Sequence, residues 1–307
     1  MSKPETTSLY EFFKLIPNEE AARKYFETKR WGDTPTCSHC GSINAVECKD
    51  HKPMPYRCRD CRKHFSVRTG TVLAESRLPL HKWLMAIYMM TTARKGIPST
   101  QMARELGITQ KSAWFLAQRI RETWLASKGN GDMGPHVQVD ETFIGGKEKN
   151  KHASKKLHAG RGSVGKQPVI GVRNQDGTVS ARPISDTSGP TLKGFIKEHV
   201  STGSTVVTDD FRSYRGMQGY NHLTVKHSVG EYVRDMAHTN GIESFWALLK
   251  RGYYGVYHYM SFKHLHRYVN EFSFRHNTSK VSTMDFISMT IGQADGKRLT
   301  YKELINA

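Results

Sequence analysis

The sequence lacks any long hydrophobic run. Its longest wholly apolar stretch is Trp83–Met90, whereas a membrane-spanning helix needs about 20 such residues. The first residues, MSKPETTSLYEFF, contain neither the basic nor the apolar segment of a signal peptide, so we expect a cytoplasmic protein. With 5 cysteines, 11 prolines and 37% hydrophobic residues in 307, the composition excludes a disulfide scaffold, a collagen and a disordered tail protein. The length allows more than one domain.

Acidic residues are few compared with basic ones. There are 28 Asp and Glu against 46 Lys and Arg, which gives a net charge of +18. This surplus indicates a polyanionic partner, with nucleic acid as the first candidate and a generally basic enzyme as the alternative. Glycines flank a basic segment at 147–166, which predicts a flexible, phosphate-binding loop. Its basic residues are Lys147, Lys149, Lys151, Lys155, Lys156, Arg161 and Lys166.

Four of the five cysteines form two C-x2-C pairs. Cys37 and Cys40 make the first pair, and Cys58 and Cys61 make the second after 17 intervening residues. Four thiolates with this spacing are typical of a tetrahedral structural zinc site, which leaves no open position for catalysis. Chance thiols in a core would not account for two correctly spaced pairs. Cys48 is expected to take no part.

Two helices follow the cysteine region. Trp83, Ile87 and Met90 recur at helical spacing, and STQMARELGITQKSAWFLAQRI then predicts two helices joined at Gly107, with Thr109 as the N-cap of the second. This pattern is typical of a helix-turn-helix whose second helix enters the major groove. The DNA-facing side chains would be Gln110, Lys111, Ser112 and Gln118. A helical pair that only packs against the next domain is the alternative.

The second half of the chain alternates strands and helices. The segment HVQVDETFIGG predicts a strand, and PVIGVRNQDGTVSARPI predicts a hairpin. A helix at 192–199, the strand STVVTDDF, a weakly indicated helix at 212–217, a strand at 222–227 and a helix at 239–251 follow. The order is strand, strand, strand, helix, strand, doubtful helix, strand, helix.

Three acidic residues stand out in this order. Asp140 lies on the first strand, Asp209 ends the fourth, and Glu243 lies on the last helix beside a buried stripe. A ribonuclease-H-like fold places two carboxylates on neighbouring strands and one on a nearby helix, where they hold two Mg2+ ions about 4 Å apart. Carboxylates are ligands that Mg2+ prefers, and Mn2+ would substitute. Lys250 lies two turns after the helical glutamate on a neighbouring face, suited to a phosphate.

Each aspartate has an acidic neighbour as a rival. Val137 and Val139 occupy the apolar face of their strand, so alternation puts Asp140 on the polar face and Glu141 on the other. Asp210 directly follows the second aspartate and is expected to open the turn. Turn caps and solvated ion pairs are the structural alternatives for all of these acids.

Several blocks together resemble a known family. RWGDTPTCSHCG, YRCRDCRKHFSVRTGTV, VDETFIGGKEK, VVTDDFRSY, HTNGIESFWALLKRG and YVNEFSFRHN occur in this order. They are similar to the zinc-ribbon DDE transposases of bacterial insertion sequences, relatives of the Merlin transposons. The resemblance implies a triad at Asp140, Asp209 and Glu243, supported by His238 and Asn240. It also implies DNA cleavage and strand transfer at terminal inverted repeats, by a homodimer or larger assembly.

Five regions are expected. They are a helical segment at 1–30, a zinc ribbon at 31–76, a helix-turn-helix at 77–130, a ribonuclease-H-like α/β catalytic domain at 131–280 and a tail at 281–307. A two-metal nuclease or resolvase that cuts without joining, and a DNA-binding regulator derived from a transposase, are the alternative functions. An intact set of carboxylates argues against the regulator, because a binding module gains nothing from acids on a DNA-facing surface.

Overall fold

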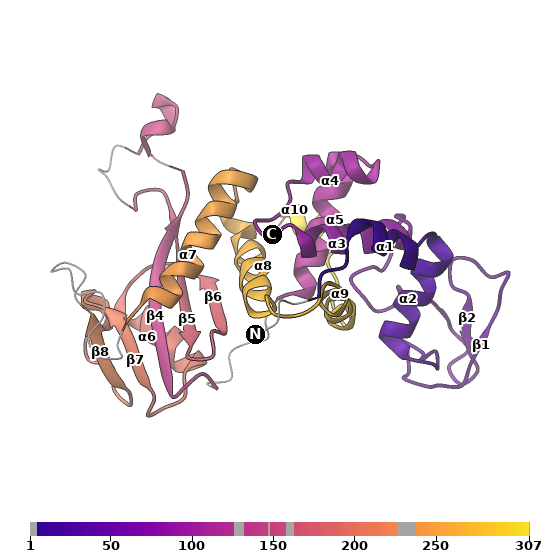
Figure 1. Cartoon of the computed structure of the whole chain (residues 1–307), viewed down its shortest axis with the longest axis horizontal. Helices are drawn as coiled ribbons and strands as arrows, with labels where there is room; N and C mark the ends of the chain where they lie inside the picture. Colours follow the sequence, from indigo (N-terminus) through magenta and orange to yellow (C-terminus); the bar gives the residue numbers. More distant parts are fainter. Residues whose placement is uncertain (1–4, 126–131, 147, 158–162, 226–237, 307) are drawn as a thin grey trace. The chain divides into compact units, whose positions relative to one another are not determined.

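The computed structural model describes residues 5–125, 132–146, 148–157, 163–225 and 238–306, and the chain divides into two compact units (Figure 1). Unit 1 comprises Met1–Trp124 and Ser279–Ala307, and unit 2 comprises Leu125–Thr278. Across the described ranges, no helix has both the length and the apolar character needed to cross a membrane. The mixed α/β architecture predicted from the sequence is confirmed.

Unit 1 is helical with a small three-stranded antiparallel sheet in the order β1-β2-β3. Its elements are α1 (Leu9–Leu15), α2 (Glu19–Trp31), β1 (Ala45–Glu47), β2 (Tyr56–Cys58), β3 (His64–Phe65), α3 (Leu80–Thr92), α4 (Ser99–Leu106), α5 (Gln110–Thr123), α9 (Thr283–Gly292) and α10 (Tyr301–Asn306). Gly107 ends α4 in the left-handed conformation, and the Thr109 hydroxyl accepts a hydrogen bond from the Ser112 N–H. The predicted turn and N-cap are therefore confirmed.

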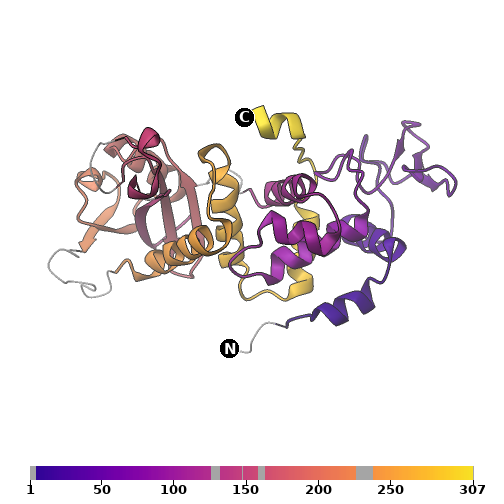
Figure 2. The same cartoon turned by 90° about the horizontal axis from the view of Figure 1, so that it is seen from above.

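The C-terminal segment belongs to this first unit. Figure 2 shows the yellow segment running among the helices of unit 1. The indole N–H of Trp124 donates to the Thr290 hydroxyl at 3.0 Å, and Arg30 pairs with Asp295. Phe286 and Ile287 are buried. Residues 281–307, expected as a tail, thus supply α9 and α10 to a unit that begins about 280 residues earlier in the chain.

Unit 2 contains a five-stranded mixed sheet in the order β6-β5-β4-β7-β8. Its elements are β4 (His136–Ile144), the 3-10 turns η1 (Glu148–Asn150) and η2 (Ala153–Lys155), β5 (Gln167–Asn174), β6 (Val179–Pro183), α6 (Gly189–His199), β7 (Thr205–Asp209), the 3-10 turn η3 (Arg212–Tyr214), β8 (Asn221–Val225), α7 (Asn240–Gly252), the π-helix η5 (Tyr253–Tyr257), the 3-10 turn η6 (Phe262–His264) and α8 (Leu265–Asn277). The pairs β4–β5 and β5–β6 are antiparallel, whereas β4–β7 and β7–β8 are parallel. The predicted element order is confirmed, and the doubtful helix is the single 3-10 turn η3.

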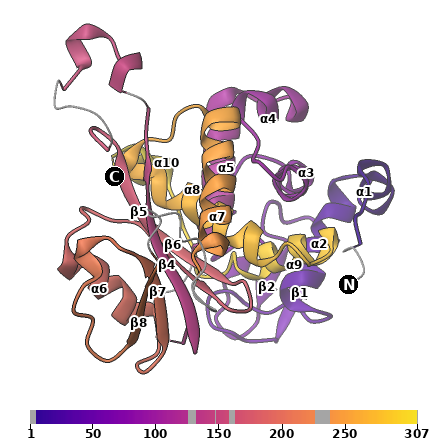
Figure 3. The ribbon, with the colours of Figure 1, turned by 60° about the vertical axis from the view of Figure 1, so that its left-hand side comes forward.

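Helices cover both faces of this sheet. Figure 3 shows α6 on one side and α7 with α8 on the other. Val137, Val139 and Ile170 pack with the α6 residues, whereas Val169 and Ile144 pack with α7 and α8. The alternation along each strand therefore separates two cores. The predicted buried stripe of α7 is present, since Ile242, Phe245, Trp246 and Leu249 are each at most 3% exposed.

Candidate active site

Asp140 and Asp209 lie at the same level on neighbouring parallel strands, Asp140 within β4 and Asp209 at the end of β7. The β4–β7 pairing runs from His136 opposite Thr205 to Gln138 opposite Val207. Asp140 lies two residues after Gln138 and Asp209 two residues after Val207, so each aspartate shares the face of the paired residue on its own strand. Neighbouring strands are about 4.8 Å apart. The Phe211 N–H donates to Asp209 Oδ1 at 3.0 Å, which holds the second carboxylate at the strand end. The fold therefore places two acids from distant segments side by side.

The surroundings of Asp140 and Glu141 disfavour the ionised forms of both carboxyl groups. Burial, followed by the negative charges of Glu141 and Asp209, raises the pKa of Asp140 to about 7. Burial, with a contribution from Asp209, also raises the pKa of Glu141. These carboxylates repel one another in a partly buried place, and a divalent cation would neutralise that repulsion. The oxygen donors present fit Mg2+ or Mn2+.

Trp246 connects helix α7 to the first aspartate. Its indole N–H donates to Asp140 Oδ2 at 3.0 Å. Gly171 lies opposite Asp140 in the β4–β5 register, and a Cβ at this glycine would approach the Trp246 ring to 2.7 Å. The absence of a side chain at this position lets the indole approach the strand closely and reach the carboxylate.

The start of α7 is held on the same strand. The Ile242 N–H donates to Gln138 Oε1 at 3.0 Å, and Gln138 Nε2 lies 3.2 Å from His238 Nδ1. His238 thus contacts the strand through the glutamine, two residues before Asp140. Asn240 is exposed at the first position of the helix.

Glu243 lies in the first turn of α7 and is exposed. Its Oε1 accepts a hydrogen bond from the Thr239 hydroxyl at 2.8 Å. Since it precedes Trp246 by three residues, it lies on a neighbouring face of the helix. In the parts of the chain that the structure describes, no three carboxylates have ligand oxygens all within 4.8 Å of one another. The structure thus brings the two aspartates together and leaves the glutamate on the adjoining helix.

One residue near the site, Tyr214, was not singled out by sequence reasoning. The Tyr214 hydroxyl donates to Glu141 Oε2 at 2.5 Å, and the tyrosine is fully buried. Burial raises the Tyr214 pKa well above its ordinary value, as do the charges of Glu141, Asp140 and Asp209. Alternation does put Glu141 on the opposite face, yet its charge still acts on Asp209. The signal was available, because the VVTDDFRSY block includes this tyrosine.

The basic segment after β4 has local order of its own. Lys151 Nζ pairs with Glu148 Oε2 at 2.5 Å, and Glu148 also accepts from the Leu157 N–H. The expected flexible loop therefore contains the two 3-10 turns η1 and η2, and Lys156 is half-buried. Lys147 and Arg161 lie outside the described residues. Only the backbone is described for Lys149 and Lys155.

The four paired cysteines of unit 1 form a compact cluster. Their sulfurs all lie within 4.8 Å of one another, with 3.6 Å between Cys37 and Cys61 and 3.7 Å between Cys40 and Cys58. A zinc ion bonded at about 2.3 Å to four tetrahedral sulfurs places these about 3.8 Å apart. The cluster therefore fits a structural zinc ion. Cys48 lies outside the cluster.

The helix α5 exposes its first turn and buries its second half. Gln110 and Lys111 are exposed and Ser112 is partly exposed, as a groove-reading helix requires. Gln118 is 0% exposed, so the expectation that it faces DNA is wrong for this structure. The reason is tertiary packing, because the strand-to-helix segment near Ala74 and helix α9 cover the C-terminal half of α5. Periodicity alone had put this glutamine on the outer face.

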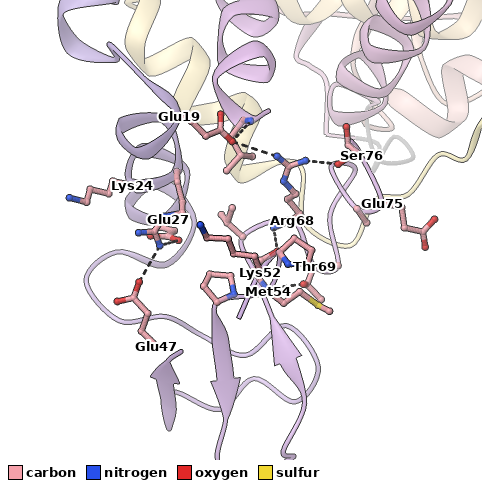
Figure 4. Close-up of a pocket in the computed structure, with 18 of the residues that line it drawn as sticks. Glu19, Lys24, Glu27, Glu47, Lys52, Met54, Arg68, Thr69, Glu75 and Ser76 are labelled. Atoms are coloured by element: carbon pink, nitrogen blue, oxygen red, sulfur yellow. Dashed lines mark hydrogen bonds and ion pairs between the residues drawn. The ribbon is translucent and has the colours of Figure 1, made fainter. Parts of the chain in front are cut away.

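A groove of ≈1510 Å³ lies between the small sheet and helices α2 and α3 (Figure 4). Arg68 lies between Glu19 and the Ser76 carbonyl in this groove. Within the described part of the chain, the lining cations Lys52 and Arg77 have no acid at ion-pair distance. Neither does Lys49, which lines the same groove. The groove therefore offers basic side chains that are not already neutralised.

Comparisons with known proteins cover both units. Residues 131–277 match the ISXO2-like transposase domain, and residues 17–64 match the transposase zinc-ribbon domain. One relative, named "Uncharacterized protein in transposable element ISH50" from Halobacterium salinarum, is 27% identical over 251 residues, 78% of this chain and 84% of that protein. An "Uncharacterized transposase-like protein" from Haemophilus influenzae is 28% identical over 102 residues, 33% of this chain and 81% of that protein. The chain therefore belongs to the insertion-sequence transposases that combine a zinc ribbon with an ISXO2-like transposase domain.

Proposed function

We propose that this transposase binds the terminal inverted repeats of an insertion sequence in the cytoplasm, cuts the DNA there and joins the freed end to target DNA. The observation that carries the proposal is the placement of Asp140 and Asp209 side by side on parallel strands, with Glu243 on the helix anchored to the same strand. The strand order β6-β5-β4-β7-β8, with β5 antiparallel to the other four strands, supports a ribonuclease-H-like fold.

The three carboxylates would hold two Mg2+ ions, for which Mn2+ would substitute. When bound, these ions would activate the attacking oxygen and stabilise the leaving oxygen of a phosphodiester. Trp246 orients Asp140 through its N–H bond, and the Phe211 N–H orients Asp209. Glu243, whose Oε1 now accepts from the Thr239 hydroxyl, would complete the ligand set from the adjoining helix. Lys250, two turns further along α7, would contact a phosphate.

Unit 1 would supply the DNA recognition. Gln110, Lys111 and Ser112 are displayed at the start of α5, which follows the tight turn at Gly107 as in a helix-turn-helix. The groove beside the zinc ribbon adds basic side chains for the phosphate backbone. The basic segment 147–166 would neutralise phosphates near Asp140. Since two element ends are processed together, the active assembly is proposed to be a homodimer or larger.

Strand transfer with pre-cut ends tests the proposal. DNA carrying the inverted repeats that flank the gene is incubated with the full chain, target plasmid and Mg2+. We expect joined products that disappear in Asp140→Asn, Asp209→Asn and Glu243→Gln and persist in Asp210→Asn, the exposed neighbour. Cleavage of the same repeats in uncut DNA, without any joined product from the pre-cut ends, would refute the transfer step in favour of a nuclease. Full activity of Glu243→Gln would refute the assigned site.

A further inference from the structure

The connection between α7 and α8 displays three exposed aromatic side chains within nine residues. Tyr254 is 49% exposed, Tyr259 is 72% exposed and Phe262 is 50% exposed. Single exposed aromatics are common on protein surfaces and need no explanation. Three in one short connection are typical of an interaction site. We name the exposed side chains Arg251, Tyr254, Tyr259, Phe262 and Lys263 the aromatic-basic surface.

The charge of this region indicates which kind of partner it binds. No acidic residue occurs between Glu243 and Glu271, a stretch that contains Lys250, Arg251, Lys263 and Arg267. Arg251 and Lys263 are exposed and lie on either side of the aromatics in the sequence. An apolar protein partner would not require this one-sided charge. Exposed aromatic rings flanked by cations suit single-stranded nucleic acid, because bases stack on the rings and the cations bind phosphates.

The backbone beneath the surface is held firmly by buried neighbours. Tyr253 is 3% exposed and Met260 is 2% exposed, so buried residues alternate with the displayed ones. His258 adopts a left-handed conformation with φ of 57°, directly after the π-helix, and its N–H donates to the Tyr253 carbonyl at 2.7 Å. Left-handed backbone at a non-glycine residue and π-helical turns occur often at functional sites.

A buried ion pair braces the same connection. The Tyr257 hydroxyl donates to the Glu271 carboxylate, 2.9 Å and 3.0 Å from its two oxygens. Glu271 is 0% exposed and pairs with Arg275 at 2.8 Å. Breaking such a buried pair is costly, so the connection keeps its shape. The displayed rings are therefore pre-positioned, which lowers the entropy cost of binding.

The position on α7 relates this surface to the proposed cutting site. Arg251 follows Glu243 by eight residues of continuous helix, which is about 12 Å along the axis. That distance is roughly three to four nucleotides of a B-form strand. We propose that the aromatic-basic surface binds unpaired bases of the DNA strand adjacent to the scissile phosphate. This inference rests on the proposed function, and it assigns a single-strand site that is separate from the duplex-binding surfaces of unit 1.

Photocrosslinking tests the inference on the full chain without Mg2+, so that no cleavage occurs. The probe is a single-stranded oligonucleotide containing 5-iododeoxyuridine, which crosslinks to stacked aromatic rings, and the attached peptides are identified by mass spectrometry. We expect crosslinks at Tyr254, Tyr259 or Phe262. Crosslinks found only in other segments would overturn the proposal.

Affinity measurements provide the second arm. The double variant Tyr254→Ala/Tyr259→Ala removes two rings on which bases would stack. Because each stacked base contributes to the binding free energy, single-strand affinity should fall by about 10-fold or more, with duplex affinity almost unchanged. Tyr10→Ala is the matched control, since Tyr10 is 70% exposed in unit 1 and should have no effect. Tyr259→Phe keeps the ring and should bind like the natural chain, which separates stacking from misfolding.

Three outcomes would refute the inference. They are an equal loss of duplex binding, unchanged single-strand binding, and a change of oligomeric state on ultracentrifugation with DNA binding intact, which would make the surface an interface between copies. Because binding is measured without Mg2+, absence of strand transfer by the natural chain would refute the proposed function alone. Normal strand transfer with an inert aromatic-basic surface would refute this inference alone.

Discussion

Replacing Asp140 by Asn should stabilise the metal-free protein. Burial and the charges of Glu141 and Asp209 raise the pKa of Asp140 to about 7, from 3.8 in an unfolded chain. The charged form is therefore disfavoured in the folded state. The stability that the neutral Asp140 carboxyl contributes is fully present below about pH 4, and it is lost as the pH rises through about 7 and the group ionises. An amide of the same shape carries no charge and still accepts the hydrogen bond of Trp246.

The magnitude follows from the size of the shift. A displacement of about three pH units corresponds to at most about 4 kcal/mol of free energy of unfolding. Because charges in a partly exposed site are screened and Glu141 relaxes when Asp140 changes, we expect about 1–3 kcal/mol at pH 8. The difference between the two proteins should shrink to near zero around pH 4. A gain of this kind is expected where a residue serves function at the expense of stability, which is the role proposed for Asp140.

Hydrogen exchange in peptides from β4 and α7 measures this effect in unit 2 alone. In metal-free buffer at pH 8, Asp140→Asn should exchange more slowly than the natural chain, and the difference should diminish at pH 5. Adding Mn2+ should slow exchange only in the natural chain. Asp210→Asn, an exposed neighbour, is the control and should change neither result. Equal or faster exchange in Asp140→Asn at pH 8, or a difference independent of pH, would refute the reasoning.

Three further predictions test other parts of the structure. Gly171→Ala should destabilise unit 2 by about 1–3 kcal/mol in denaturant unfolding, because its Cβ would meet an indole ring at 2.7 Å. Native mass spectrometry should find one zinc per chain, lost in Cys58→Ser and retained in Cys48→Ser; loss in both would contradict the four-ligand site. Lys111→Ala should weaken DNA binding with unchanged thermal stability, whereas Gln118→Ala should lower thermal stability, since only the second side chain is buried.

Local chemistry was readable from the sequence. The cysteine spacing predicted the cluster, Gly107 and Thr109 predicted the turn and the cap, and alternation predicted the order of strands. The turn, the cap and the strands depend on residues a few positions apart, whose backbone geometry is set by near neighbours, and the cysteine cluster depends on two short C-x2-C pairs with a recognisable spacing. The buried stripe of α7 was predicted for the same reason, because helical periodicity determines which side chains share a face.

Contacts between distant segments were decided by the tertiary structure. The parallel pairing of β4 with β7 puts Asp140 beside Asp209, and the hydrogen bond from Trp246 spans 106 positions. Gln118 is buried because other segments cover α5, a covering that helical periodicity does not encode. The last thirty residues return to unit 1 for a similar reason. Their apolar side chains must be buried against another apolar surface. Which surface that is depends on the tertiary packing of unit 1, to which residues distant in the sequence contribute.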